Sequence, residues 1–172
     1  MQKNHFDLFG LPVAFNIDTG RLDQAYRQLQ ARIHPDRYAT GTDSERLRSL
    51  QAATETNEAY QTLKDPLSRA RYLLHLNGID TQEESNTTMP AEFLMRQMEW
   101  REAIEEARSA GNIPALENLG RALRHEAVQL KEALGAALDL RGDYPGASET
   151  VRKLRFLDKV QAEIDLAIET LE

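Results

Sequence analysis

The stretch "RIHPDRYA", Arg32 to Ala39, interrupts a helical pattern with a proline. Apolar residues recur at helical spacing before it, and Pro35 disfavours helix at the preceding residue, so we predict that the first helix stops at His34. A second amphipathic pattern begins near Ser44. Two helices of similar length joined by a short loop favour an antiparallel hairpin. Its tip would present an imidazole, a rigid proline and the carboxylate of Asp36.

The rest of the chain also favours helices. Long stretches are rich in Ala, Leu, Glu, Gln and Arg, and only 9 glycines and 6 prolines are spread over 172 residues. This composition predicts an all-α fold. We predict a hairpin domain with flanking short helices over 1–77, a polar linker over 78–90 and an antiparallel three-helix bundle over 91–172. The predicted helices are 5–9, 18–34, 44–64, 67–76, 91–109, 114–140 and 144–171, the sixth weakened by Gly120 and Gly135.

Charge is shared unevenly along the chain. Residues 1–77 carry ten Lys or Arg and nine Asp or Glu, whereas residues 78–172 carry eleven and nineteen. An acidic second half argues against a nucleic-acid partner. The N-terminus lacks the apolar core of a signal peptide, and no apolar run approaches the roughly 20 residues that span a bilayer. We therefore expect a soluble, cytoplasmic protein with no membrane partner.

Residue types also limit the chemistry. Cysteine is absent, which excludes disulfides and thiol nucleophiles. Because iron–sulfur clusters are usually held by cysteine thiolates, we do not expect this chain to hold one itself. The four histidines are scattered, and none has a second ligand at an established metal spacing. The glutamates at 99, 102, 105 and 106 lack the Glu-x-x-His motifs of di-iron bundles. We therefore expect no metal, no cofactor and no enzymatic activity.

Two signatures together resemble a known family. Two helices joined by His-Pro-Asp, followed by "TNEAYQTLKDPLSRARYLL" at 56–74, resemble a J-domain, the part of a co-chaperone that stimulates ATP hydrolysis by seventy-kilodalton chaperones. "FDLFGLP", "RYLLHLNG", "AEFLMRQMEWREAIEE" and "TVRKLRFLDKV" are similar to the HscB family, J-type co-chaperones of iron–sulfur cluster biogenesis. The eukaryotic branch carries a cysteine-rich N-terminal metal site, so this cysteine-free chain resembles the bacterial form.

The resemblance implies a first partner, an HscA-type seventy-kilodalton chaperone. His34 and Asp36 would contact it, and Pro35 would fix their relative placement. A basic helix face next to the tip would steer the encounter electrostatically. The residues expected at this chaperone-binding site are Arg27, Arg32, His34, Pro35, Asp36 and Arg37.

The helix at 91–109 has two different apolar faces. Phe93, Trp100, Ile104 and Ala107 share one stripe at about 100° per residue, which predicts a bundle core. Three further apolar residues lie off this stripe, on a face that is rich in glutamate. Either the core stripe is wide, or the first half packs there, or the face binds a partner through apolar anchors with an acidic surround.

The last helix repeats the anomaly. Val151 and Leu154 define its core side with Leu157 at the edge, whereas Phe156 lies roughly 200° from Leu154 and is expected to be exposed beside Arg155. These two regions resemble the surface with which HscB proteins bind the IscU scaffold. The matching residues are Leu94, Met95, Met98, Glu99, Glu102, Glu106, Arg155 and Phe156, with Met98 at a position where another aliphatic residue is commoner.

The leading interpretation is a co-chaperone that delivers the IscU-type scaffold to the HscA-type chaperone and stimulates its ATPase. A J-domain adaptor with a different client would use the same tip but another bundle face. A small helical enzyme using His34 and Asp36 would show turnover in isolation. Nothing near the tip completes a pocket chemistry, which argues against the enzyme. The resemblance to HscB over nearly the whole chain favours the first interpretation over the adaptor.

Overall fold

The computed structural model describes residues 4–34, 36, 39–83 and 88–172. Throughout these ranges the regular elements are helices, which confirms the all-α prediction. The chain divides into two compact units, Met1–Asn77 and Gly78–Glu172. Each unit has its own buried residues and is described separately below.

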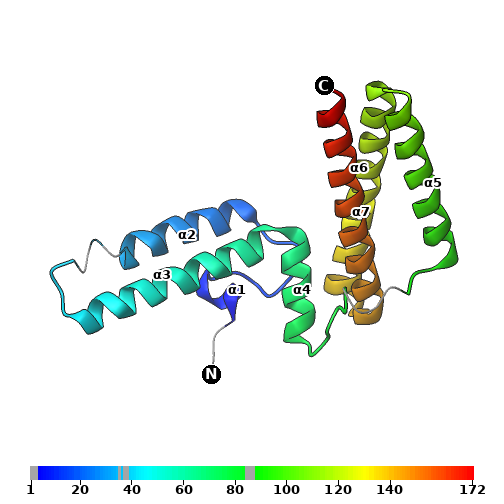
Figure 1. Ribbon diagram of the computed structural model, residues 1–172. Helices are drawn as coiled ribbons and strands as arrows, with labels where there is room; N and C mark the ends of the chain where they lie inside the picture. Colours follow the sequence, from blue (N-terminus) through cyan, green and yellow to red (C-terminus); the bar gives the residue numbers. More distant parts are fainter. Residues whose placement is uncertain (1–3, 35, 37–38, 84–87) are drawn as a thin grey trace. The chain divides into compact units, whose positions relative to one another are not determined.

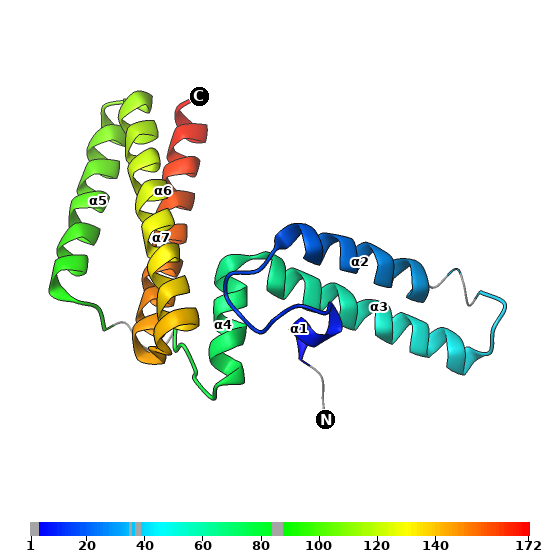
Figure 2. The same ribbon diagram turned by 180° about the vertical axis from the view of Figure 1, so that it is seen from behind.

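The first unit is a helical hairpin with two short flanking helices. Its elements are α1 (His5–Leu8), α2 (Thr19–Ile33), α3 (Asp43–Lys64) and α4 (Pro66–Leu76). Helices α2 and α3 lie side by side and antiparallel in both views (Figures 1 and 2). The predicted hairpin is therefore present, and His34 is the residue at which α2 ends.

Side-chain caps determine where these helices begin. Asp18 accepts a hydrogen bond from the backbone N–H of Arg21 at the start of α2. Thr42 and Glu45 form a reciprocal capping box at the start of α3. Asp65 follows the last residue of α3 and caps α4. The first residue of α4 is a proline, which has no backbone N–H that would need an acceptor. Polar capping residues thus set where α2, α3 and α4 begin.

A buried guanidinium ties three parts of the first unit together. Arg69 on α4 is only 6% exposed. Its Nε donates to the carbonyl of Phe15 at 2.6 Å, and Nη1 donates to the carbonyl of Leu63 at 2.7 Å. The guanidinium also lies 4.8 Å from the centre of the Phe15 ring. This arginine belongs to the second signature, and its contacts are internal to the unit.

The second unit is a bundle of three long helices. They are α5 (Ala91–Ser109), α6 (Ile113–Gly135) and α7 (Tyr144–Leu171). Neighbouring helices run in opposite directions and lie side by side in both views (Figures 1 and 2). Side chains from all three form one core, with Leu116, Val160 and Ile164 at most 1% exposed. The predicted antiparallel bundle is confirmed.

The structure corrects the middle helix of the bundle. We predicted one helix over 114–140, but α6 ends at Gly135 and the backbone continues as a π-helical segment, η2 (Ala136–Arg141). Gly142 then adopts φ 61°, a left-handed conformation that glycine takes without strain and that commonly follows a helix end. The interior glycine therefore marks a real change of helix type.

Two apolar positions in α3 differ from the expected stripe. The amphipathic pattern that begins near Ser44 places Leu47 and Leu50 on the apolar face of this helix, but each is 56% exposed. Further along the same helix, Ala59 and Leu63 are fully buried. Only the C-terminal part of α3 therefore supplies core residues.

We expect Arg69→Ala to lower the free energy of unfolding by about 3 kcal/mol, because two buried carbonyls lose a charged donor. Urea denaturation followed by far-UV circular dichroism measures this change. Arg48→Ala is the matched control, because Arg48 is exposed on α3 and its loss should cost less than about 0.5 kcal/mol. Equal effects of the two substitutions would contradict the structural role of Arg69.

Candidate partner-binding sites

The tip of the hairpin presents two polar side chains to solvent. The side chains of His34 and Asp36 are 58% and 91% exposed. Nδ1 of His34 accepts the backbone N–H of Asp36 at 3.2 Å and lies 3.5 Å from its carboxylate. The imidazole and the carboxylate thus lie next to each other in an exposed loop. Pro35 and Arg37 lie outside the described residues.

Contacts across α2 and α3 hold the base of this hairpin. The rings of Tyr26 and Tyr60 stack with centroids 4.0 Å apart. Asp23 accepts hydrogen bonds from the Tyr60 hydroxyl at 2.7 Å and from the Lys64 ammonium at 2.8 Å. Hydrogen bonds from Lys64 and Tyr60 lower the pKa of Asp23. The carboxylate thus contributes to stability at neutral pH, and that contribution is lost as the pH falls through its lowered pKa.

These contacts explain the Asn-Glu-Ala-Tyr part of the second signature. Asn57 accepts a hydrogen bond from the Tyr26 hydroxyl, Ala59 is fully buried, and Tyr60 makes the stack and the bond to Asp23. Their role is to pair α3 with α2. These three residues of the signature therefore hold the two helices of the hairpin together.

One positioning residue is missing from the sequence interpretation. Ser49 is 6% exposed, and its hydroxyl donates to the carbonyl of Ile33 at 2.8 Å. Ile33 is the last residue of α2 and directly precedes His34. This bond therefore fixes the end of α2 against α3. A lone serine in a polar stretch gives no sequence signal for such a role.

The basic side chains expected beside the tip lie on the surface of α2. Arg27 and Arg32 are both exposed. The positive charge of Arg27 also contributes to lowering the pKa of Asp23. Cations at these positions are available to attract an acidic partner surface to the side of the hairpin.

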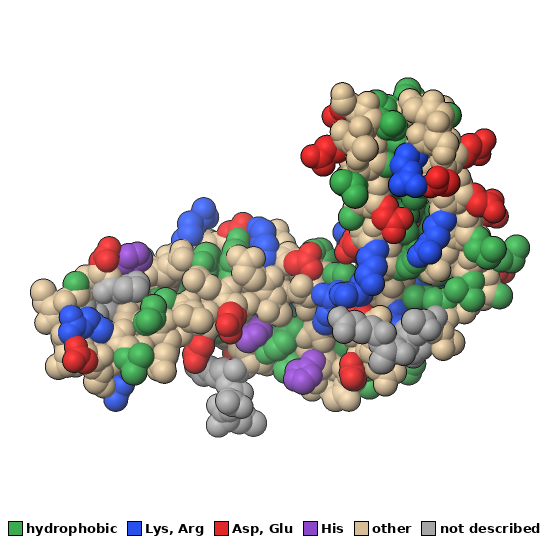
Figure 3. Space-filling view, in the orientation of Figure 1, with side chains coloured by type: hydrophobic (Ala, Val, Ile, Leu, Met, Phe, Trp, Pro, Cys, Tyr) green, Lys and Arg blue, Asp and Glu red, His purple; other side chains and the backbone are tan. Residues whose placement is uncertain are grey.

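The outward face of α5 carries an apolar patch, defined as Leu94, Met95 and Met98. Their exposed fractions are 44%, 62% and 65%. At about 100° per residue, the patch lies on the side of α5 opposite its buried residues. Figure 3 shows hydrophobic side chains along the outer side of this helix near its start, with acidic side chains further along. The predicted separation of a core stripe and an exposed apolar face is confirmed.

Three glutamates accompany the patch on the same side of the helix. Glu99, Glu102 and Glu106 are exposed. Within the described ranges, no Lys, Arg or His nitrogen comes within 4.0 Å of their carboxylates. Arg96 pairs instead with Glu126 on α6, and Arg108 pairs with Glu105. The three carboxylates are therefore free to meet cations of another molecule.

The structure corrects the environment of Phe156. This side chain is partly buried and packs against the bundle core, so the prediction that it is exposed is wrong. Its ring lies 5.9 Å from that of Phe93 and 6.4 Å from that of Trp100, centre to centre. Leu157, expected at the edge of the core, is only 2% exposed. Both sides of α7 are covered because it packs against α5 as well as α6.

Arg155 lies beside this aromatic cluster in a groove between α5, α7 and the segment before α5. Its guanidinium is 4.0 Å from the carboxylate of Glu83. The groove has a volume of about 190 Å³ and is lined by Glu83, Met89, Gln97, Arg152, Arg155, Phe156 and Lys159. Phe156 faces the inward side of α5, whereas the apolar patch faces away from it. Phe156 therefore does not share the exposed face of α5 on which the other six predicted residues lie.

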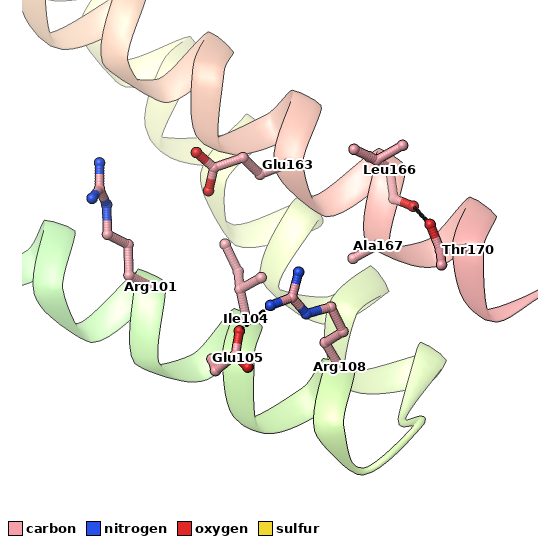
Figure 4. A pocket seen from close by; sticks show the side chains of 8 residues that line it. All are labelled: Arg101, Ile104, Glu105, Arg108, Glu163, Leu166, Ala167 and Thr170. Carbon is pink, nitrogen blue, oxygen red and sulfur yellow. Dashed lines mark hydrogen bonds and ion pairs between the residues drawn. The ribbon is translucent and has the colours of Figure 1, made fainter.

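A larger hollow near the other end of the bundle lacks a catalytic arrangement. Its volume is about 330 Å³, and Figure 4 shows side chains of α5 on one side and α7 on the other. Glu105 is paired with Arg108, and the Thr170 hydroxyl donates to the carbonyl of Leu166 at 2.8 Å. The lining residues are Arg101, Ile104, Glu105, Arg108, Glu163, Leu166, Ala167 and Thr170. Its polar groups bond to one another or face solvent.

Among the residues that the structure describes, no three His, Asp or Glu side chains gather as metal ligands would. In the same residues, every helix is too short or too polar to cross a bilayer.

Both halves of the chain match known protein domains. The DnaJ domain matches residues 4–72, which contain the hairpin and its exposed tip. The chain is therefore a J-domain protein. The HSCB C-terminal oligomerisation domain matches residues 89–165, which contain most of the bundle. The chain belongs to the HscB family of co-chaperones.

Relatives match over the whole length. Co-chaperone HscB homologues from Azoarcus sp. and Paraburkholderia xenovorans are 51% and 52% identical, over 100% of this chain and 97% and 98% of theirs. The structure of chaperone HscB from Vibrio cholerae has a TM-score of 0.86 at 36% identity, covering 99% of this chain and 100% of that one. Human co-chaperone HscB has a TM-score of 0.89 at 30% identity, covering 96% and 82%.

We expect Phe156→Ala to destabilise the bundle by about 2 kcal/mol, because the ring fills space between Phe93 and Trp100. Urea denaturation followed by the fluorescence of Trp100, the chain's single tryptophan, measures the change. Met98→Ala removes an exposed side chain and should leave the transition unchanged. An unchanged transition for Phe156→Ala as well would mean that the ring acts only at the surface.

Proposed function

We propose that this co-chaperone brings an IscU-type scaffold protein of iron–sulfur cluster assembly to an HscA-type seventy-kilodalton chaperone and stimulates that chaperone's ATP hydrolysis. Membership of the HscB family supports this function. The observation that carries it is that a polar hairpin tip and an apolar patch are both exposed and belong to different compact units. Each surface is available to a separate partner.

In this proposal the hairpin tip acts on the chaperone. His34 offers an exposed imidazole ring and Asp36 an exposed carboxylate, two residues apart in the same loop. Pro35 has a fixed φ and restricts the residue before it, which limits the conformations of this pair. Contacts that the tip makes only with the hydrolysing state of the chaperone would shift the chaperone toward that state.

Basic residues would bring the chaperone to the tip. Arg27 and Arg32 are exposed on α2, and Arg37 follows the tip in sequence. Long-range attraction between these cations and an acidic surface would raise the association rate, and salt would screen it. The proposed role of the three arginines is thus in the rate of encounter.

The bundle would carry the scaffold. Leu94, Met95 and Met98 provide apolar anchors, and thioether side chains adapt to the shape of a partner. Glu99, Glu102 and Glu106 would meet cations at the rim of the interface. Arg155 and Phe156 would contribute from the adjoining groove, with Phe156 also holding α5 in place. An adaptor with a different client would keep the tip but bind another protein through this face.

The chain performs no covalent step in this mechanism and needs no cofactor. ATP is bound and hydrolysed by the chaperone, and the cluster belongs to the scaffold. The proposed contribution of this chain is to increase the local concentration of scaffold at the chaperone while the tip contacts it.

We expect His34→Gln to abolish stimulation of the chaperone's ATPase, because Gln cannot reproduce the ring's geometry in the loop. The unfolding midpoint should stay the same, since the described contacts of His34 are confined to Asp36. Steady-state ATPase assays with the cognate chaperone and scaffold measure the effect. His75→Gln, the same change at an exposed histidine of α4, is the matched control.

Two outcomes would contradict this role of the tip. Full stimulation by His34→Gln would remove the imidazole from the mechanism. Loss of stimulation together with loss of scaffold binding would mean that His34 supports the structure.

We expect the triple change of Leu94, Met95 and Met98 to Ser to weaken scaffold binding by about tenfold or more, because the interface loses its apolar anchors. Isothermal titration calorimetry with the scaffold protein measures the affinity. Val128 and Leu140 are 53% and 83% exposed on other elements, so changing both to Ser gives a control of the same chemistry.

The triple variant should still stimulate the chaperone at high concentration without scaffold, because its tip is intact. Unchanged scaffold binding by the triple variant would reject the patch. Failure of the unaltered chain to bind any IscU-type scaffold would favour the adaptor with a different client.

A further inference from the structure

Two of the protein's sulfur atoms belong to the exposed apolar patch of α5. The chain has four methionines and no cysteine. Met1 lies outside the described residues, and Met89 is partly buried and packs against the bundle core. Met95 and Met98 are 62% and 65% exposed. The most accessible sulfurs that the structure describes therefore both belong to the apolar patch.

Their position makes oxidation consequential. Residues 95 and 98 are three apart on α5, so their side chains are neighbours on the helix surface. Oxidation of a thioether to a sulfoxide turns an apolar side chain into a polar one. Both sulfoxides would lie next to Leu94, on the face that depends on apolar character. Oxidation would therefore change the patch while the core side of α5 stays intact.

We propose that Met95 and Met98 form a reversible oxidation site through which hydroperoxides switch off scaffold binding. This inference rests on the proposed function of the patch. Each thioether sulfur takes one oxygen atom from the peroxide: the O–O bond breaks, an S–O bond forms, and hydrogen peroxide leaves as water. A methionine sulfoxide reductase reverses the step, with two thiols oxidised to a disulfide and the oxygen released as water.

The site separates the two activities of the protein. Apart from Met1, the first unit contains no sulfur, so the tip has no group that reacts in the same way. Trp100, another oxidisable side chain, is only 8% exposed on the core side of α5. Mild oxidation would therefore stop delivery of the scaffold and leave the contact with the chaperone unchanged.

The first experiment tests the chemistry on the free protein. The chain is treated with limiting hydrogen peroxide, and tandem mass spectrometry of proteolytic fragments locates each added oxygen. We expect Met95 and Met98 to be oxidised several times faster than Met89, following their exposure. Equal or faster oxidation of Met89 would overturn the assignment of the site, whether or not the scaffold binds.

The second experiment tests the consequence. Peroxide is removed before the scaffold is added, so that only this chain is oxidised, and calorimetry gives the affinity. We expect oxidation to weaken binding by about tenfold or more and the reductase to restore it. The double variant Met95→Leu, Met98→Leu has no thioether in the patch, so peroxide should leave its affinity at the value measured for that variant before treatment. Met89→Leu should remain sensitive.

The results distinguish this inference from the function on which it rests. Tight binding by both the reduced and the oxidised chain would overturn the switch and leave the proposed function standing. Loss of binding in the double Leu variant after peroxide would also overturn the switch, because the damage would lie elsewhere. Absence of binding by the reduced chain would overturn the proposed function and the switch together.

Discussion

The pairing of α2 with α3 is the constraint on which the hairpin depends. A tip can act on another protein only if its two supporting helices hold it in one place, because a loose loop would lose its geometry on contact. Here the Tyr26–Tyr60 stack, the bonds to Asp23 and the Ser49 bond to Ile33 provide that support. The polar residues of the tip are therefore not needed to hold the two helices together, and they remain exposed.

In the bundle, an aromatic cluster holds the helix that carries the exposed patch in place. Phe93 and Trp100 on α5 pack edge to face with each other and contact Phe156 on α7. Three interlocking rings fix the rotation of α5 about its axis, since turning the helix would separate them. That rotation determines which side chains face outward. The exposed patch is thus a consequence of how the opposite face is packed.

Much of this arrangement follows from local sequence. Prolines and capping residues set the helix ends, and α5 shows separate core and exposed faces because its apolar residues fall into two groups. The environment of Phe156 does not follow, because periodicity gives the direction of a side chain but not the number of neighbouring helices. The π-helical segment after Gly135 and the exposure of Leu47 depend on packing that no local pattern encodes.

Charge would help the two proposed surfaces to select different partners. The first unit is nearly balanced and carries exposed cations on α2, whereas the second has an excess of acid with unpaired glutamates beside the patch. Attraction acts on the sign of a partner's surface before any close contact forms. An acidic chaperone surface would be attracted to the hairpin and repelled by α5. A basic scaffold surface would be attracted to α5 and repelled by the cations of α2. Under the proposed function, two such surfaces would keep the partners from competing for one site, and oxidation of the patch would then interrupt one contact alone.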